Sequence, residues 1–339
     1  MFICFAVTVP SHSQDAKLVE LRKDFARRYL QPNAHYALAK YYLDRGNNVQ
    51  AFFITEYARR YRFEEKDFDE TYVAFFGDPM PEPPDEAKDL FKTASELVTQ
   101  QKYDEAETYF QKAYAKYDKS FFINVWIGRF YYKARSDNSK ALPFYFKAYF
   151  LYPHAYETEY AEYRIRAIIT ADAEKSFKAY LASGKQLSEL ARDENPLIVG
   201  MAITEMAKNW KPEYLNAVLD AMSNDDSVVR WGAFVTLQKY AGTSLPQIVD
   251  GMFSDKDLRK RGLAAYAIAE SAGQKKFQIL EKMLSDDAEL VRFDAVSALV
   301  KKGRPTATAI LRKHARFEKQ PRLKALIDAT LNTTPRKAP

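Results

Sequence analysis

The chain has 339 residues, of which 47% are hydrophobic and 28% charged, so it can form packed cores and is not disordered as a whole. A single cysteine and four scattered histidines exclude a disulfide framework and a cysteine zinc site, and they leave little material for any metal centre. No apolar stretch reaches the roughly 18 residues that a membrane span needs. At roughly 100–200 residues per domain, the length suggests about two domains.

The net charge of +6 is concentrated in the C-terminal half. Residues 1–195 hold 28 Lys/Arg against 29 Asp/Glu, or −1, whereas residues 196–339 hold 23 against 16, or +7. This excess predicts an acidic or nucleic-acid partner, or alternatively a solvated terminal cap that ends in a flexible tail over 332–339.

The N-terminus combines eight apolar residues, 2–9, with a segment of small and polar residues, 10–13. This order is typical of the apolar region and cleavage site of a secretory signal. The basic residues that normally open such a signal are absent, because the first Lys or Arg is Lys17. We therefore expect residues 1–13 to be either a signal peptide of an exported or periplasmic protein, or an apolar tail of a cytoplasmic one.

Residues 14–153 carry a pattern that recurs every 34–35 residues. In two consecutive copies, 87–118 and 122–153, small and aromatic residues recur at set positions, as in Ala106, Phe110 and Ala113. A weaker copy covers 32–63. Between the first two copies lies the stiff connector 77–84, whose four prolines forbid a helix.

These copies resemble the tetratricopeptide repeat over about residues 32–153. The resemblance implies helical hairpins whose first helices line a concave groove. Carried over by position, that groove would present Phe91, Ser95, Val98, Trp126, Phe130 and Lys133. Exposed aromatic side chains there would anchor a peptide or a helix, whereas the alternative is that Trp126 and Phe130 belong to the core.

Two departures from the family limit what the resemblance implies. Arg129 stands where the family usually has a small residue, which implies a looser or rearranged contact between helices. Chaperone-binding members use a Lys and an Asn at the positions of Phe91 and Ser95 to hold a terminal carboxylate. That clamp is absent, so we do not expect this chain to capture an acidic C-terminal peptide.

Residues 154–192 fit neither repeat pattern of the chain and are expected to form a helical bridge. Tyr156, Tyr160 and Tyr163 lie at i, i+4 and i+7, which gives this helix an aromatic face. Packing against the preceding repeat is the expected use of that face.

The C-terminal part repeats every 31 residues. Arg230, Arg261 and Arg292 follow one another at this interval, and a further copy is expected one residue early, at Arg322. A second series agrees with the first: Ala217, Ile248, Ile279 and Ile310. Each copy combines two helical patterns with an acidic turn that suits a helix N-cap, so the copies should be helical hairpins that stack into a solenoid.

A turn acid six residues before an arginine, as in Asp255 with Arg261 and Asp286 with Arg292, resembles the HEAT-like repeats of phycobilisome lyases. The resemblance covers about residues 193–331 and implies a ladder of acids and arginines between repeats. Val199 replaces the arginine in the first copy. The expected fold is all-α: a tandem α-solenoid with tetratricopeptide-like hairpins followed by about five HEAT-like hairpins.

No P-loop, zinc-protease or nucleophile-elbow motif occurs, so we expect a non-catalytic scaffold for protein partners, without cofactor or metal. A nucleic-acid-binding module is the first alternative, with a basic patch formed by Lys256, Arg259, Lys260, Arg312, Lys313 and Arg316. A lyase or chaperone-like helper for a chromophore or client protein is the second. A residual glycosylase-like alternative would use Trp231, Arg230 and Asp294.

Overall fold

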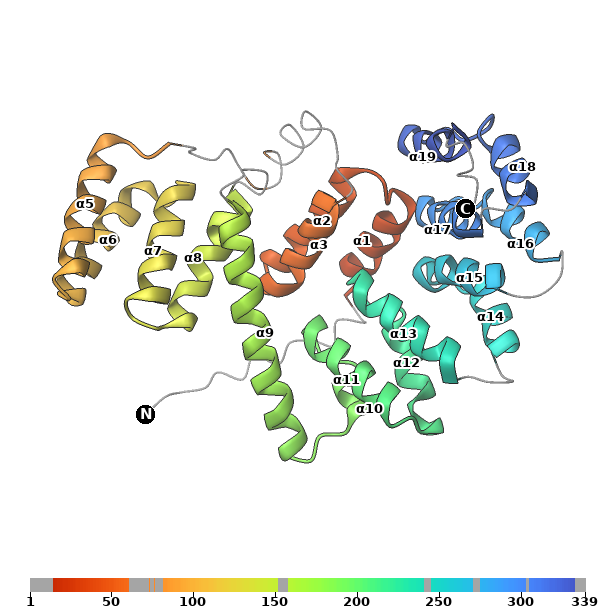
Figure 1. Ribbon diagram of the computed structural model, residues 1–339, viewed down its shortest axis with the longest axis horizontal. Helices are drawn as coiled ribbons and strands as arrows, with labels where there is room; N and C mark the ends of the chain where they lie inside the picture. Colours follow the sequence, from red (N-terminus) through yellow and green to blue (C-terminus); the bar gives the residue numbers. More distant parts are fainter. Residues whose placement is uncertain are drawn as a thin grey trace, which may run out of the picture. The chain divides into compact units, whose positions relative to one another are not determined.

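A computed structural model describes residues 15–60, 73, 76, 82–151, 158–240, 245–270, 275–302 and 305–332 (Figure 1). All regular secondary structure in these residues is helical, and the helices pack in consecutive pairs, which confirms the expected all-α helical-repeat solenoid. The expected leader, most of the proline-rich connector and nearly all of the C-terminal tail lie outside the described residues.

The chain divides into two compact units, one of which is discontinuous. Unit 1 joins the chain up to Tyr41 with the chain from Gly184 onward, and unit 2 is Tyr42–Ser183. This division differs from the expected one at two places. Residues 15–41, which we expected within the first repeat array, pack with the C-terminal repeats, and the expected bridge 154–192 is split between the units.

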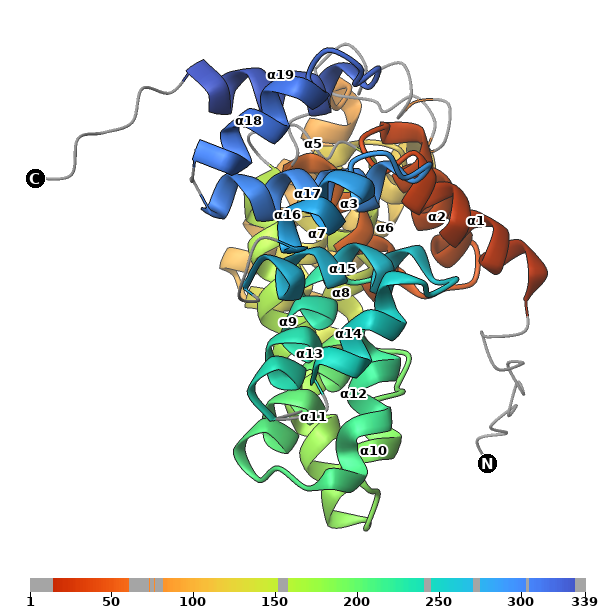
Figure 2. The ribbon, with the colours of Figure 1, turned by 90° about the vertical axis from the view of Figure 1, so that its right-hand side faces the viewer.

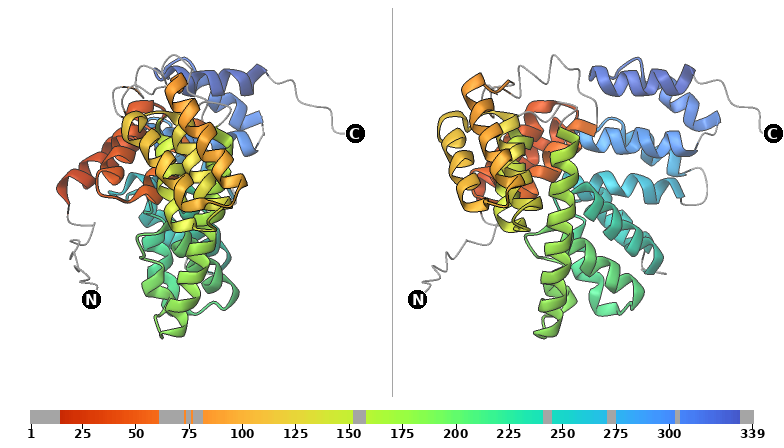
Figure 3. Two further views of the ribbon diagram at one scale, coloured as in Figure 1. Left: turned by 90° about the vertical axis from the view of Figure 1, so that its left-hand side faces the viewer. Right: turned by 60° about the vertical axis from the view of Figure 1, so that its left-hand side comes forward.

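Unit 2 contains hairpins of antiparallel helices followed by one long helix (Figure 3). Its helices are α3 (Asn48–Arg60), α5 (Asp85–Thr99), α6 (Tyr103–Tyr117), α7 (Phe121–Lys133), α8 (Asn138–Leu151) and α9 (Thr158–Ala182). Helix α5 pairs with α6, α7 pairs with α8, and α9 packs on α8. Buried alanines such as Ala94, Ala106 and Ala141 allow this close packing, because a methyl group lets helix axes approach each other.

The small residue of the second hairpin is Gly128. A Cβ atom built on Gly128 would lie 2.9 Å from two ring carbons of Tyr145, so α7 and α8 touch at this point. Ala94 precedes Ala106 by 12 residues, whereas Gly128 precedes Ala141 by 13, because the second hairpin turn holds one more residue. The expectation that Arg129 occupies the small position was therefore wrong by one residue, and Arg129 is exposed.

Unit 1 is a stack of helical layers (Figure 2). It begins with α1 (Ala16–Arg27) and most of α2 (Pro32–Leu43). The stack itself consists of α10 (Leu187–Leu190), α11 (Pro196–Lys208), a 3-10 turn (Pro212–Tyr214), α12 (Leu215–Ala221), α13 (Ser227–Tyr240), α14 (Leu245–Phe253), α15 (Leu258–Glu270), α16 (Lys275–Met283), α17 (Glu289–Lys302), α18 (Pro305–His314) and α19 (Pro321–Asn332).

The acidic turns of unit 1 share one hydrogen-bond pattern. The first side-chain oxygen of each turn residue accepts a hydrogen bond of 2.8–2.9 Å from the backbone N–H two residues later. These turn residues are Asp193, Asn224, Asp255 and Asp286. Such a bond fixes the start of the following helix, because it occupies a donor that has no partner inside that helix.

Two steps of the expected ladder between arginines and acids are present in the structure. Arg261 donates to the carbonyl of Asp255 at 3.3 Å and to the carboxylate of Asp286 at 2.9 Å. Arg292 repeats this arrangement, with the carbonyl of Asp286 at 3.0 Å and the carboxylate of Glu318 at 3.1 Å. Each arginine therefore joins its own turn to the next one.

The first and last steps of the ladder differ. Arg230 is buried and donates to the backbone carbonyls of its own turn, at Asn224 (2.8 Å) and Asp225 (3.0 Å). In the last repeat, Glu318 takes the place of Asp286 and lies 32 residues later, so this turn gains a residue where we expected a loss. Arg322 accordingly lies outside the ladder.

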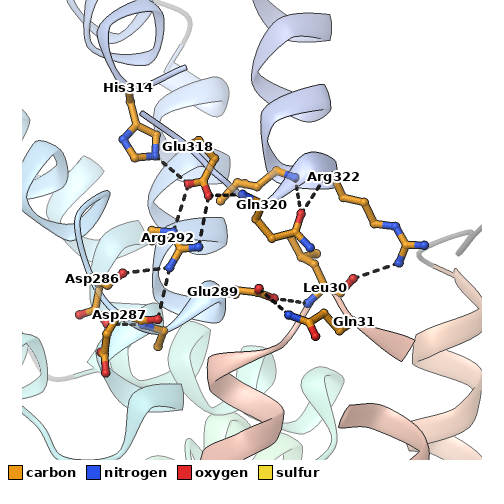
Figure 4. A network of polar contacts seen from close by, with 12 residues as sticks. Leu30, Gln31, Asp286, Asp287, Glu289, Arg292, His314, Glu318, Gln320 and Arg322 are labelled. Atoms are coloured by element: carbon orange, nitrogen blue, oxygen red, sulfur yellow. Dashed lines mark hydrogen bonds and ion pairs between the residues drawn. The ribbon is translucent and has the colours of Figure 1, made fainter. Parts of the chain in front are cut away.

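The segment 15–31, which we call the N-terminal strap, lies along the turns before α13 and α17. The Nε atom of Arg22 is 2.9 Å from both carboxylate oxygens of Asp225, whose side chain is buried. At the other end, Glu289 accepts hydrogen bonds of 3.0 Å from the backbone of Leu30 and the amide of Gln31 (Figure 4). Contacts with α15 and α17 complete this packing (Figure 1).

Candidate functional site

Unit 2 has a hollow of about 340 Å³ between α5, α6 and α7. All six groove residues expected from the sequence line it: Phe91, Ser95, Val98, Trp126, Phe130 and Lys133. Three further lining residues were not anticipated, namely Phe110, Arg129 and Ala134. Arg129 could have been found from the sequence, because it lies three residues after Trp126 and four before Lys133, on the same helical face.

Aromatic rings form the walls and floor of this hollow. The rings of Phe91 and Trp126 stack with centroids 3.9 Å apart and planes 26° apart, which joins the first helices of the two hairpins. Beneath them, the rings of Phe110 and Phe130 lie 4.8 Å apart. Phe130 is only 5% exposed, so it belongs to the core, whereas Phe91 and Trp126 are half-buried and reach the surface.

The rim of the hollow carries two exposed cations, Arg129 and Lys133. Neither makes an ion pair or hydrogen bond with the side chains of the described residues. The next arginine along the chain behaves differently. Arg135 pairs with Asp104 and, at 3.0 Å, with Glu107. No carboxylate of the described residues lines the hollow, so its local charge is positive.

A separate cluster of aromatic side chains joins α7 to α9. Arg164 donates to the hydroxyl of Tyr132 at 3.1 Å, and its guanidinium lies 4.6–5.2 Å from the rings of Tyr132, Tyr160 and Tyr163. Tyr160 packs toward the preceding repeat as we expected, with its ring 6.1 Å from that of Tyr145. Tyr163 is 63% exposed, and Tyr156 lies outside the described residues.

The residues of the expected basic patch do not form one surface. Lys256, Arg259 and Lys260 belong to α15 and the turn before it, whereas Arg312, Lys313 and Arg316 belong to α18 and the turn after it. Helices α16 and α17 lie between these positions in the stack (Figure 2). In addition, one residue of each cluster forms ion pairs with acids of unit 1.

Arg259 and Lys313 are held by acidic partners within unit 1. Arg259 is buried, with Asp225 at 2.5 Å and Asp257 at 2.9 Å. Burial works to lower the pKa of Arg259, but these two carboxylates outweigh it and raise the pKa. Lys313 pairs with Glu281 at 2.6 Å. Lys256, Arg312 and Arg316 are exposed, and Lys260 is half-buried.

A second hollow, of about 630 Å³, lies in unit 1 beside the last step of the ladder. His314 and Arg292 both contact Glu318 there, at 2.9 and 3.1 Å (Figure 4). Burial works to raise the pKa of Glu318, but the hydrogen bonds from His314 and Arg292 prevail and hold it at about 2. The charged groups of this hollow thus serve to join two repeats.

A buried carboxyl group lies deeper in unit 1. Burial raises the pKa of Asp294 to about 7, although Arg230 and a hydrogen bond from Tyr266 act in the opposite direction. The Tyr266 hydroxyl lies 3.1 Å from Asp294, and the Tyr266 ring lies 5.0 Å from that of the partly exposed Trp231. Trp231 and Asp294 therefore both contact Tyr266, whereas Arg230 donates hydrogen bonds to the backbone of its own turn.

The described residues contain no group of three or more His, Cys, Asp or Glu side chains placed to hold a metal ion. Among the described helices, none is both long and apolar enough to span a bilayer. Comparisons with protein-family models, with curated proteins and with solved structures return no match. The chemistry of the chain's own surfaces therefore has to carry any functional assignment.

Proposed function

We propose that this protein is a non-catalytic repeat scaffold that binds a protein partner through the hollow between α5 and α7. One observation carries the proposal: side chains from two consecutive hairpins converge on a single aromatic hollow that opens to the surface. In a repeat protein, surfaces of this kind are continuous across neighbouring units and suit extended partners.

The exposure of the rings supports binding over simple packing. A core requires apolar side chains to be covered, yet Phe91 and Trp126 stack against each other while remaining partly exposed. Aromatic side chains in a partly desolvated recess are typical anchors of protein interfaces, because they bury a large area at low conformational cost. A hollow of about 340 Å³ is near the lower end of ligand sites and would suit one or two partner side chains.

The finer assignment of the repeats belongs to the same proposal. The alternation of small and aromatic residues in α5–α8 supports tetratricopeptide-like hairpins. The turns and arginines of unit 1 support HEAT-like repeats of the phycobilisome-lyase type. Export through a leader at 1–13 also remains part of the proposal, and reading the N-terminus of the mature protein would test it.

The two alternatives draw less support from the geometry. Nucleic-acid binding would need a stripe of free cations across several repeats, but Arg259 is buried and Lys313 is paired with Glu281. A helper role for a chromophore or client is supported only by the resemblance of the repeats, and fold alone is weak evidence of function.

Affinity capture of the tagged full-length protein from its native cells would test the proposal. We would compare the wild type with Ser95→Trp, which fills the hollow, and Trp126→Ala, which removes one wall. Replacing Phe130 is less useful because it is buried and its loss would leave a cavity in the core. Trp231→Ala is the matched control, since Trp231 is a partly exposed tryptophan in unit 1.

If the protein is a scaffold, we expect the wild type to capture partners that resist nuclease treatment. These partners should be lost with Ser95→Trp and Trp126→Ala but captured normally by Trp231→Ala. Circular dichroism should show the same helix content for all four proteins. Partners that persist with both hollow variants would reject the hollow as the binding site. Partners that vanish on nuclease treatment would favour the nucleic-acid alternative.

A further inference from the structure

The charged residues that line the hollow between α5 and α7 are all basic. Its lining combines aromatic and small residues with two cations, Arg129 and Lys133, and includes no acidic side chain among the described residues. Both cations are exposed and therefore accessible to a partner. A partner that buries the rings must also bring its own groups close to these two charges.

Elsewhere on the same hairpins, several cations are paired with acids, whereas others, such as Lys112 and Lys119, form no ion pair among the described residues. Lys116 pairs with Glu86 at 2.5 Å, and Lys147 pairs with Asp118 at 2.7 Å. Lys88 pairs with Asp85 at 3.1 Å. In the described part of the chain, Arg129 and Lys133 are thus among the cations of α5–α8 without a carboxylate partner, and they are the ones that line the hollow.

The spacing of these residues on α7 places charge beside the aromatic wall. Trp126, Arg129 and Lys133 lie at i, i+3 and i+7, and residues three or four apart on a helix have Cβ atoms about 5–6 Å apart. Arg129 and Lys133 therefore flank the rings on one face of α7, and both line the same hollow as Phe91 and Trp126.

We infer that the hollow binds an acidic peptide segment in which a bulky apolar residue lies close to Asp or Glu. The apolar side chain packs on the Phe91–Trp126 pair, and the carboxylates meet Arg129 and Lys133. This inference rests on the proposed function, because it names the partner of the same site. Charge complementarity of this kind contributes more to orientation and specificity than to raw affinity.

The helical geometry limits the spacing in the peptide. An α-helix rises about 1.5 Å per residue, so Arg129 and Lys133 lie roughly 4.5 and 10.5 Å along α7 from Trp126, and an extended peptide advances about 3.3 Å per residue. A peptide that runs along α7 therefore covers these distances in about one to three residues. The apolar anchor and the acidic residue should thus lie within about three positions of each other.

Selection of random peptides displayed on phage against the full-length protein would test the inference. The selected peptides would be synthesised, labelled with fluorescein and titrated by fluorescence anisotropy. The charge variant is Arg129→Glu with Lys133→Glu. Its matched control is Lys112→Glu with Lys119→Glu, which makes the same change in net charge at two exposed lysines away from the hollow. Ser95→Trp blocks the hollow itself, and thermal unfolding of each variant checks its fold.

The expected consensus holds a bulky apolar residue with Asp or Glu within about three positions. Affinity should fall about tenfold or more in the charge variant and in Ser95→Trp, and stay within about twofold in the control. It should also weaken as the salt concentration rises. Peptides without acidic residues that bind the charge variant normally but lose binding to Ser95→Trp would overturn the inference and leave the proposed function standing. If every selected peptide binds Ser95→Trp as tightly as the wild type, both the inference and the proposed function are rejected.

Discussion

Gly128 sets the approach of α7 to α8 and so positions the wall of the hollow. Its missing methyl group leaves room for the Tyr145 ring, and Trp126 and Phe130 lie two residues to either side on the same helix. Ala94 has the corresponding place in the first hairpin, where it is fully buried. One methyl group more or less at these positions changes how closely two helices pack.

Replacing Gly128 with alanine should therefore destabilise the protein. The new Cβ would lie 2.9 Å from the Tyr145 ring, and overpacking of this kind costs about 1–3 kcal/mol. Gly200→Ala is the matched control, because a Cβ there meets nothing within 4 Å, and alanine favours a helix by about 0.5–1 kcal/mol over glycine. In urea unfolding measured by circular dichroism, the midpoint should fall for Gly128→Ala and rise for Gly200→Ala, relative to the wild type. Equal midpoints would refute the close contact.

Asp294 gives unit 1 a specific dependence on pH. An acid whose pKa is about 7 when folded and about 4 when unfolded takes up a proton on folding. Its contribution to stability is therefore present below about pH 4 and is lost as the pH rises to about 7. His35 acts in the opposite sense, because burial lowers its pKa to about 4.

Comparison with Asp294→Asn isolates this contribution. The variant keeps an acceptor for the Tyr266 hydroxyl but cannot ionise. Its free energy of unfolding relative to the wild type should increase by about 2–4 kcal/mol between pH 4 and pH 7, and level off above that, since one pKa unit corresponds to about 1.4 kcal/mol. Urea titrations of both proteins across this range measure the difference. A difference that stays constant with pH would contradict the assignment.

At the scale of helices, α1 behaves as part of the C-terminal stack. Its buried side chains, Leu18, Phe25 and Ala26, lie on one face, while Arg22 reaches the buried carboxylate of Asp225. Asp225 also binds Arg259, so one acid joins the strap to α15. A carboxylate buried in this way depends on its partners, because an unpaired buried charge is costly.

Arg22→Ala should consequently loosen α1. Hydrogen bonds to charged groups contribute about 1.5–3 kcal/mol, and Arg259 remains to bind Asp225, so we expect a loss of about 1–3 kcal/mol. Hydrogen exchange should show faster amide exchange in α1 than in the wild type. Lys23→Ala, an exposed change on the same helix, serves as the control. If both variants exchanged alike, the ion pair would not hold the strap.

At the scale of the whole molecule, the sequence predicted what depends on local periodicity. The all-α class and the 31-residue repeat follow from regular spacing of apolar, small and acidic residues, whereas the lining of the hollow was carried over by position from the resemblance to the tetratricopeptide repeat. Single-residue insertions before Ala141 and before Glu318 escaped this reasoning, because each shifts the register without changing the composition. The strap escaped it for another reason: the partners of Arg22 and Leu30 lie 203 and 259 residues away.

The discontinuity of unit 1 also imposes an order on biosynthesis. The contact between Arg322 and Leu30 spans 292 residues, which a ribosome working at about 5–20 residues per second takes roughly 15–60 s to synthesise. Residues 42–183 emerge in full during that interval and can form their own unit first. Helix α1 meanwhile lacks its partners α15 and α17, and only a chain that extends through α17 can supply both. A chain that stops before α17 would therefore leave part of the apolar face of α1 exposed to chaperones and proteases.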